Sequence, residues 1–85
     1  MAGIRVGIVG VGFGQQVLIP AFQSVPKFTV TAVAASSAYR AERVRERFGL
    51  RIAYGDWRAL VDSNLVDVVA GERVLLIMFQ VLGQL

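Results

Sequence analysis

The sequence predicts an α/β fold, with a partial doubly wound parallel sheet and flanking helices. Three observations predict it: short apolar runs rich in β-branched residues, segments of helical spacing between them, and a glycine-rich turn after the first run. Strands that alternate with helices pair in parallel, because each crossover returns the chain to the same edge of the sheet. The 85 residues support one small domain. We place this domain at residues 1–70 and an apolar tail of uncertain structure at 71–85.

The first strand is expected over Ile4–Val9, a nearly continuous apolar run that Gly10 closes. A helix is expected over Phe13–Gln23. Pro20 should kink it or restart it near Ile19, because proline has a rigid ring and no amide hydrogen. The side chains of this helix that we expect to face inward are Val17, Ala21 and Phe22.

The second strand, over residues 28–35, is the clearest, because it combines β-branched and small residues without a charge. Ser36 or Ser37 can then cap a helix over residues 38–48, and Gly49 suits its left-handed end. The inward face of this helix is expected to hold Ala41, Val44 and Phe48.

A short strand is expected over residues 52–54, and Asp56 should cap a helix from Trp57 to about Asp62. Another β-branched run predicts a fourth strand over residues 65–70. The expected order is therefore β-α-β-α-β-α-β, with every strand parallel to its neighbours.

Composition excludes several kinds of chemistry. Without cysteine or histidine the chain offers no disulfide, no thiolate metal site and no imidazole base, so we assign no metal ligand. The formal net charge is +3, with arginines concentrated over residues 40–51. This segment is either a solvated helix face or an anion contact. Glu42 and Glu46 interrupt it and no aromatic stripe accompanies it, so we expect no nucleic-acid partner.

The sequence also indicates a compartment. The first residues enter a strand-like run at once, unlike a signal peptide. The apolar stretch over residues 74–82 is far shorter than the ~20 residues that span a bilayer. We therefore expect a soluble, cytoplasmic protein with no membrane partner.

The turn after the first strand has the context of a dinucleotide-binding G-x-G-x-x-G motif, with a strand before it and a helix after it. Gly10 permits the tight turn, and Gly12 lets the backbone approach a pyrophosphate. The backbone amides of Gly10, Gly12, Phe13 and Gly14 are expected to hold the pyrophosphate, near the positive end of the helix. Gln15 occupies the third motif position, so either Gly14 replaces that glycine with a one-residue offset or Gln15 turns outward. The alternative is a turn whose glycines serve packing alone.

The end of the second strand indicates which dinucleotide is bound. NAD is usually held there by an acidic residue on the ribose hydroxyls, but this chain has Ala35. Ser36, Ser37 and Arg40 follow, and hydroxyls with a guanidinium suit a 2′-phosphate. The sequence therefore favours NADP over NAD. The alternative is that Ser37 is only a helix cap and Arg40 only a surface charge.

A set of segments in a fixed order carries a family resemblance. They are residues 6–15, 19–22, 32–36, 40–42, 48–49, 54–61 and 66–70. Together they resemble the N-terminal Rossmann domain of the Gfo/Idh/MocA oxidoreductases. The resemblance implies hydride transfer between a nicotinamide cofactor and an alcohol or sugar-like carbonyl compound. It also implies a second, mostly β, substrate domain through which members commonly oligomerise.

The resemblance stops near Ala70. There the family usually continues with an Ile-Ala-Thr-Pro-Pro-like loop and a Glu-Lys-Pro segment, and a later histidine often acts as acid or base. This chain has no histidine, and its only lysine, Lys27, precedes the second strand. No catalytic residue carries over, so we expect a truncated domain that is not catalytically competent alone.

The tail over residues 71–85 leaves three structures open: a final strand, a helix on the sheet, or sequence foreign to the family. A truncated gene, a shifted reading frame or a deletion junction would each give such an ending. An alternative function follows from the tail, namely a non-enzymatic interaction module that docks on a partner or a second copy. Self-association would then use this tail or a sheet edge.

Overall fold

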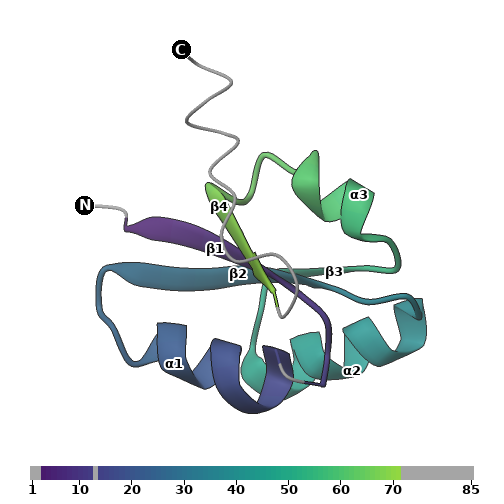
Figure 1. Ribbon diagram of the computed structural model, residues 1–85, viewed down its shortest axis with the longest axis horizontal. Helices are drawn as coiled ribbons and strands as arrows, with labels where there is room; N and C mark the ends of the chain where they lie inside the picture. Colours follow the sequence, from purple (N-terminus) through teal and green to yellow (C-terminus); the bar gives the residue numbers. More distant parts are fainter. Residues whose placement is uncertain (1–2, 13, 72–85) are drawn as a thin grey trace.

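The computed structural model describes residues 3–12 and 14–71, and Figure 1 shows a sheet with helices on both faces. The elements are β1 (Ile4–Val9), the π-helix η1 (Gly14–Leu18), α1 (Ile19–Gln23), β2 (Phe28–Ala34), α2 (Ala38–Phe48), β3 (Ile52–Tyr54), α3 (Trp57–Val61) and β4 (Val68–Gly71). The strand order is β3-β2-β1-β4, and every neighbouring pair is parallel. The predicted α/β class and element order are confirmed. This order matches the first four strands of a doubly wound dinucleotide-binding sheet, whose order is 3-2-1-4-5-6.

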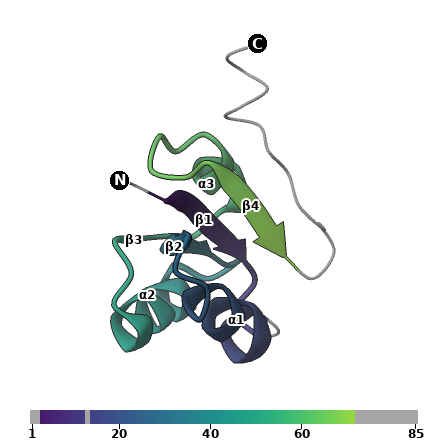
Figure 2. The ribbon, with the colours of Figure 1, turned by 90° about the vertical axis from the view of Figure 1, so that its left-hand side faces the viewer.

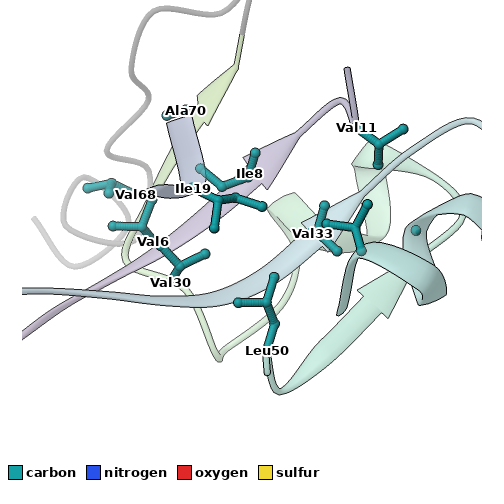
Figure 3. Close-up of a cluster of buried hydrophobic side chains, with 11 residues drawn as sticks. Val6, Ile8, Val11, Ile19, Val30, Val33, Leu50, Val68 and Ala70 are labelled. Carbon is teal, nitrogen blue, oxygen red and sulfur yellow. The ribbon is translucent and has the colours of Figure 1, made fainter. Parts of the chain in front are cut away.

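Two apolar clusters lie on the two faces of the sheet. Helices α1 and α2 cover one face and α3 covers the other, as both ribbon views show (Figures 1 and 2). The larger cluster joins the first face to α1 and α2 through side chains that include Val6, Ile8, Ile19, Val33 and Val44 (Figure 3). The smaller cluster joins the second face to α3 through Ala32, Ala34, Leu60, Val66 and Val69. Burial on both faces explains why the strand sequences are continuously apolar.

A register shift in β2 places Val30 and Val33, three residues apart, in the same apolar cluster. Along β1, Val6 pairs with Val30 but Gly7 pairs with Ala32, so Thr31 is an extra residue in the ladder. The Thr31 hydroxyl donates to the carbonyl of Leu65 at 2.7 Å. The small side chains Ala32 and Ala34 consequently lie under α3. Gly7 also faces α3. A Cβ at this position would lie 2.9 Å from side-chain carbons of Leu60 and Val66, which is too close for any residue but glycine unless these side chains shift.

The first helix differs from its prediction in which face it buries. The restart that Pro20 was expected to cause is present, since α1 begins at Ile19 after the π-helical η1. Ile19 is fully buried, but Val17 is 45% exposed and Ala21 is also exposed, so both expected inward positions were wrong. The wider i→i+5 winding of η1 shifts the buried face away from the regular helical spacing. Phe22 is half-buried as expected, and its ring meets Phe28 edge-on at 5.1 Å.

The predicted start signals of α2 and α3 and the predicted stop signal of α2 are confirmed. Ser37 Oγ accepts a hydrogen bond from the Arg40 amide at 3.3 Å, and Gly49 ends α2 with φ +70°. Asp56 Oδ1 accepts from the Arg58 amide at 3.1 Å. Each signal lies within a few residues of its helix, so the sequence alone is sufficient to place it.

The fourth strand begins later than predicted, at Val68 instead of Leu65. The Leu65 carbonyl accepts the Thr31 hydroxyl, and the carboxylate of Asp67 binds Arg5 at the start of β1. These long-range bonds hold the segment in a loop, although Val66 within it is fully buried. The predicted tail at 71–85 lies, from Glu72 on, outside the described residues, so the interaction-module hypothesis stays a prediction.

Candidate functional site

The glycine turn leads from the carboxyl end of β1 into η1. Gly10 has φ +98°, a left-handed conformation that side chains with a Cβ rarely adopt. Its amide donates to the carbonyl of Ala34 at 2.8 Å, which ties the turn to the end of β2. Gly10 therefore shapes the turn, and its amide is already engaged within the protein.

Gly12 has a different environment. Apart from its chain neighbours, a Cβ built on Gly12 meets no atom of the described residues within 4 Å, and its backbone needs no left-handed φ. Its carbonyl accepts from the Gln16 amide at 3.1 Å, whereas its amide donates no turn or loop bond within residues 3–12 and 14–71. The space beside Gly12 is therefore open, as a ligand phosphate approaching the backbone requires. Phe13, another predicted phosphate contact, lies outside the described residues, and Gly14 is the first residue of η1.

Gln15 joins the turn to α2. Its Nε2 donates to the Val11 carbonyl at 3.0 Å, and its Oε1 accepts from Arg47 Nη1 at 3.1 Å. The sequence left open whether Gln15 turns outward. The structure shows it directed toward α2, where its half-buried side chain borders a pocket.

A basic pocket of about 620 Å³ lies between the glycine turn and α2. Its lining residues are Val11, Gln15, Tyr39, Arg40, Arg43, Val44, Glu46 and Arg47. Arg43 Nη1 donates to the Tyr39 hydroxyl at 3.3 Å, and its guanidinium carbon lies 5.8 Å from the centre of the Tyr39 ring. The pocket thus gathers three guanidiniums beside the turn predicted to hold phosphate.

The acidic residues of α2 do not neutralise these arginines. Glu42 accepts from Arg45 Nε at 2.9 Å, and this bond lowers the pKa of Glu42 and raises that of Arg45. Glu46 has its carboxylate 4.0 Å from the same Arg45. In the described part of the chain, no carboxylate oxygen lies within 4.0 Å of the arginines that line the pocket. The pocket therefore attracts anions.

A second, more apolar pocket of about 330 Å³ lies where β1 and β2 end and α3 begins. Its lining residues are Val9, Gly10, Ala34, Ala35, Ser36, Gly55, Asp56 and Trp57. Trp57 is 49% exposed, and the guanidinium of Arg58 lies 4.8 Å from the centre of its ring. Sequence reasoning placed Trp57 only at a helix start. The expected parallel order could have found it, because it sets the turn after β3 beside the turn after β2.

The two pockets share the glycine turn and the loop after β2. Gly10 and Ser36 line the apolar pocket, whereas Val11 and Arg40 line the basic one. Ser37 caps α2 between them. The structure thus brings together the turn and the second-strand residues that were predicted separately, and it offers an apolar surface for a base next to cations for a phosphate.

Two other kinds of site are absent from residues 3–12 and 14–71. These residues contain no group of three acidic, histidine or cysteine side chains that could hold a metal ion. Over the same ranges, no helix has the length and hydropathy to cross a membrane.

A family model described as "Oxidoreductase family, NAD-binding Rossmann fold" (GFO_IDH_MocA) matches residues 4–70. The chain belongs to the Gfo/Idh/MocA family of oxidoreductases. The resemblance stated from the sequence is therefore confirmed, and the described sheet is a Rossmann-type α/β fold of a dinucleotide-binding oxidoreductase family. A search of curated proteins gives no match.

Solved structures agree with this assignment. The 3-ketoreductase KijD10 from Actinomadura kijaniata, solved with NADP and TDP-benzene, is 37% identical with a TM-score of 0.70, over 79% of this chain and 21% of that one. An NAD binding oxidoreductase from Klebsiella pneumoniae is 32% identical with a TM-score of 0.67, over 84% and 21%. A probable dehydrogenase from Thermotoga maritima shares the fold, at 22% identity and a TM-score of 0.73, over 80% and 20%. The chain thus spans about a fifth of the length of each.

Proposed function

We propose that this Gfo/Idh/MocA domain binds NADP in preference to NAD. The observation that carries the proposal is the basic pocket, which places Arg40 beside the loop where the adenosine ribose is held in this fold. Ala35 stands where an NAD-binding domain usually has a carboxylate, so no carboxylate at this position repels a 2′-phosphate. The relative KijD10 was solved with NADP, which supports the same cofactor.

Each residue of the glycine turn would contribute to cofactor binding in a different way. The diphosphate would lie in the open space beside Gly12, facing the first amides of the helix at Phe13 and Gly14. Gly10 would keep the turn tight, and Gln15 would fix it from the side of α2. Adenine would enter the apolar pocket against Trp57, so that Ser36, Ser37 and Arg40 meet the ribose 2′-phosphate.

Catalysis is a separate proposal. A bound nicotinamide supplies hydride transfer, in this family to or from an alcohol or sugar-like carbonyl group. The sequence holds no histidine, and Lys27 lies between α1 and β2, at the opposite end of the strands from the glycine turn. We infer that these residues bind and orient the cofactor, and that proton transfer needs groups which this sequence does not contain. A cytoplasmic location remains part of the proposal.

The test is an equilibrium titration of the folded full chain with NADPH and NADH. Trp57 is the only tryptophan, so its fluorescence reports on the apolar pocket, and nicotinamide fluorescence gives a second signal. We expect saturable binding of both, with NADPH tighter. No binding of either at millimolar concentration would contradict dinucleotide binding, whereas tighter NADH would contradict only the preference.

The Arg40→Ala variant tests the cation assigned to the 2′-phosphate. A charge-assisted hydrogen bond contributes about 1.5–3 kcal/mol, so the affinity for NADPH should fall about tenfold or more. The affinity for NADH should change little, because NADH lacks that phosphate. Equal losses for the two cofactors would show that Arg40 does not contact the 2′-phosphate.

A further inference from the structure

Helix α2 presents its arginines in two groups. Arg40, Arg43 and Arg47 are spaced three and four residues apart and share the helix face that borders the basic pocket. Arg45 lies on another face, paired with Glu42. Arg51, beyond the helix, does not line the pocket. The arginines that border the pocket are thus distinguishable from those that do not.

The three arginines that line the basic pocket differ in the contacts that their side chains make within the protein. Arg47 donates to Gln15 and is therefore engaged in fixing the turn. Arg43 has the Tyr39 hydroxyl at 3.3 Å and the Tyr39 ring at 5.8 Å, two uncharged contacts that orient the guanidinium and leave other donors for a ligand. No side-chain bond of Arg40 is present within the described residues. Tyr39 thus orients the Arg43 guanidinium, and no carboxylate of the described residues lies within 4.0 Å to neutralise its charge.

The charge of the ligand argues for a second cation. A phosphate monoester carries about −1.5 to −2 at pH 7 and offers three acceptor oxygens. One guanidinium supplies a single positive charge, and a serine hydroxyl supplies none. A guanidinium one helical turn beyond Arg40 and in the same pocket would complete the neutralisation. Among the described residues that line this pocket, Glu46 is the only acidic one, and its carboxylate lies 4.0 Å from Arg45.

We propose that Arg43, oriented by Tyr39, is a second specificity-determining residue for the 2′-phosphate of the dinucleotide. This inference rests on the proposed function, because it requires that the adenosine ribose lies at Ser36. The basic pocket then selects the phosphorylated cofactor through Arg40 and Arg43 together. Arg47 acts from a distance, by holding the turn through Gln15.

The experiment compares two small ligands, 2′,5′-ADP and 5′-AMP, which differ only in the 2′-phosphate. Dissociation constants are measured by calorimetry for the full chain, wild type and Arg43→Gln. We expect Arg43→Gln to weaken 2′,5′-ADP about tenfold, the equivalent of about 1.4 kcal/mol, and to change 5′-AMP less than about twofold. Tyr39→Phe keeps the ring but loses the hydroxyl acceptor, and it should weaken 2′,5′-ADP by a smaller factor.

Arg51→Gln is the matched control, because it removes the same charge outside the pocket and should leave the ratio of the two constants unchanged. An equal loss for Arg51→Gln would mean that net charge alone sets the affinity, and would overturn the inference. An Arg43→Gln ratio equal to that of wild type would also overturn it, while leaving dinucleotide binding intact. A folded wild-type chain that binds neither ligand would instead contradict the proposed function itself.

Discussion

At the scale of single residues, the first two glycines of the motif have different physical roles. Gly10 has a left-handed φ and an engaged amide, whereas Gly12 has ordinary φ and open space at its Cβ position. The sequence predicted both as phosphate contacts, because backbone torsion and open space are not visible in a residue type. The structure adds that the Gly10 amide is engaged by the Ala34 carbonyl and that the space beside Gly12 is open.

Gly12→Val is therefore expected to preserve the fold and to block the cofactor. A Cβ at this position meets no atom of the described residues within 4 Å, apart from its chain neighbours, so the midpoint of thermal unfolding should stay near that of wild type. The affinity for NADPH should fall at least about tenfold, because the branched side chain fills the space in which we propose that the diphosphate binds. Gly10→Val is the control, since the positive φ there should cost about 1–3 kcal/mol of stability. If Gly12→Val bound NADPH as tightly as wild type, the result would contradict the placement of the diphosphate at this turn.

The ion pair between Arg5 and Asp67 predicts a pH dependence of stability. Arg5 donates to the Asp67 carboxylate from Nε at 3.0 Å, from Nη2 at 2.8 Å and from its amide at 2.9 Å. Hydrogen bonding from the Arg5 side chain lowers the pKa of Asp67. Because the folded-state pKa lies below the unfolded one, this stability is present above about pH 4 and is lost as pH falls through the folded-state pKa.

Asp67→Asn should therefore lower the free energy of unfolding at pH 7 by about 1–2 kcal/mol, given the half-exposed setting of the pair. It should also flatten the fall in stability below about pH 4. Urea unfolding followed across pH 2–7 measures both effects. Asp62→Asn removes the same charge from an exposed position and should change neither. If the free energy of unfolding of Asp67→Asn fell as steeply below about pH 4 as that of wild type, carboxylates other than Asp67 would cause the acid sensitivity.

At the scale of elements, the sequence predicts best what neighbouring residues determine. The bounds of α2 agree residue by residue, because Ser37 and Gly49 mark both ends locally. The buried face of the first helix was wrong because π-helical winding leaves no signature in apolar spacing. The start of β4 was wrong because the bonds from Thr31 and Arg5 come from residues more than 30 positions away.

The Thr31 bond gives a test at this scale. Thr31→Val keeps the shape of the side chain but leaves the Leu65 carbonyl without its donor, so stability should fall by about 1 kcal/mol. Thr29→Val, at an exposed position of the same strand, should cost nothing or stabilise slightly. Urea unfolding of the two variants compares them directly. Equal stabilities would mean that the hydroxyl bond does not hold the loop before β4.

At the scale of the whole molecule, alternation of strands and helices was sufficient to predict a parallel sheet, and the family followed from the order of its segments. The two pockets were not predictable, because their lining comes from elements distant in sequence: the glycine turn, α2 and the turn after β3. The predicted residues Gly10, Gln15, Ser36 and Arg40 line these pockets. Trp57 and Arg43 also line the pockets, and it is the fold that brings them there.

The most direct measurement is a ¹⁵N–¹H NMR titration of the full chain with NADPH, because each backbone amide reports its own environment. We expect shifts concentrated at the glycine turn, from Gly10 to Gln15, and at the start of α2, from Ser36 to Arg43. Residues on the far side of the molecule, such as Lys27 and Asn64, should remain unchanged. Shifts confined to other surfaces, or none at saturating NADPH, would contradict the placement of the cofactor at this turn.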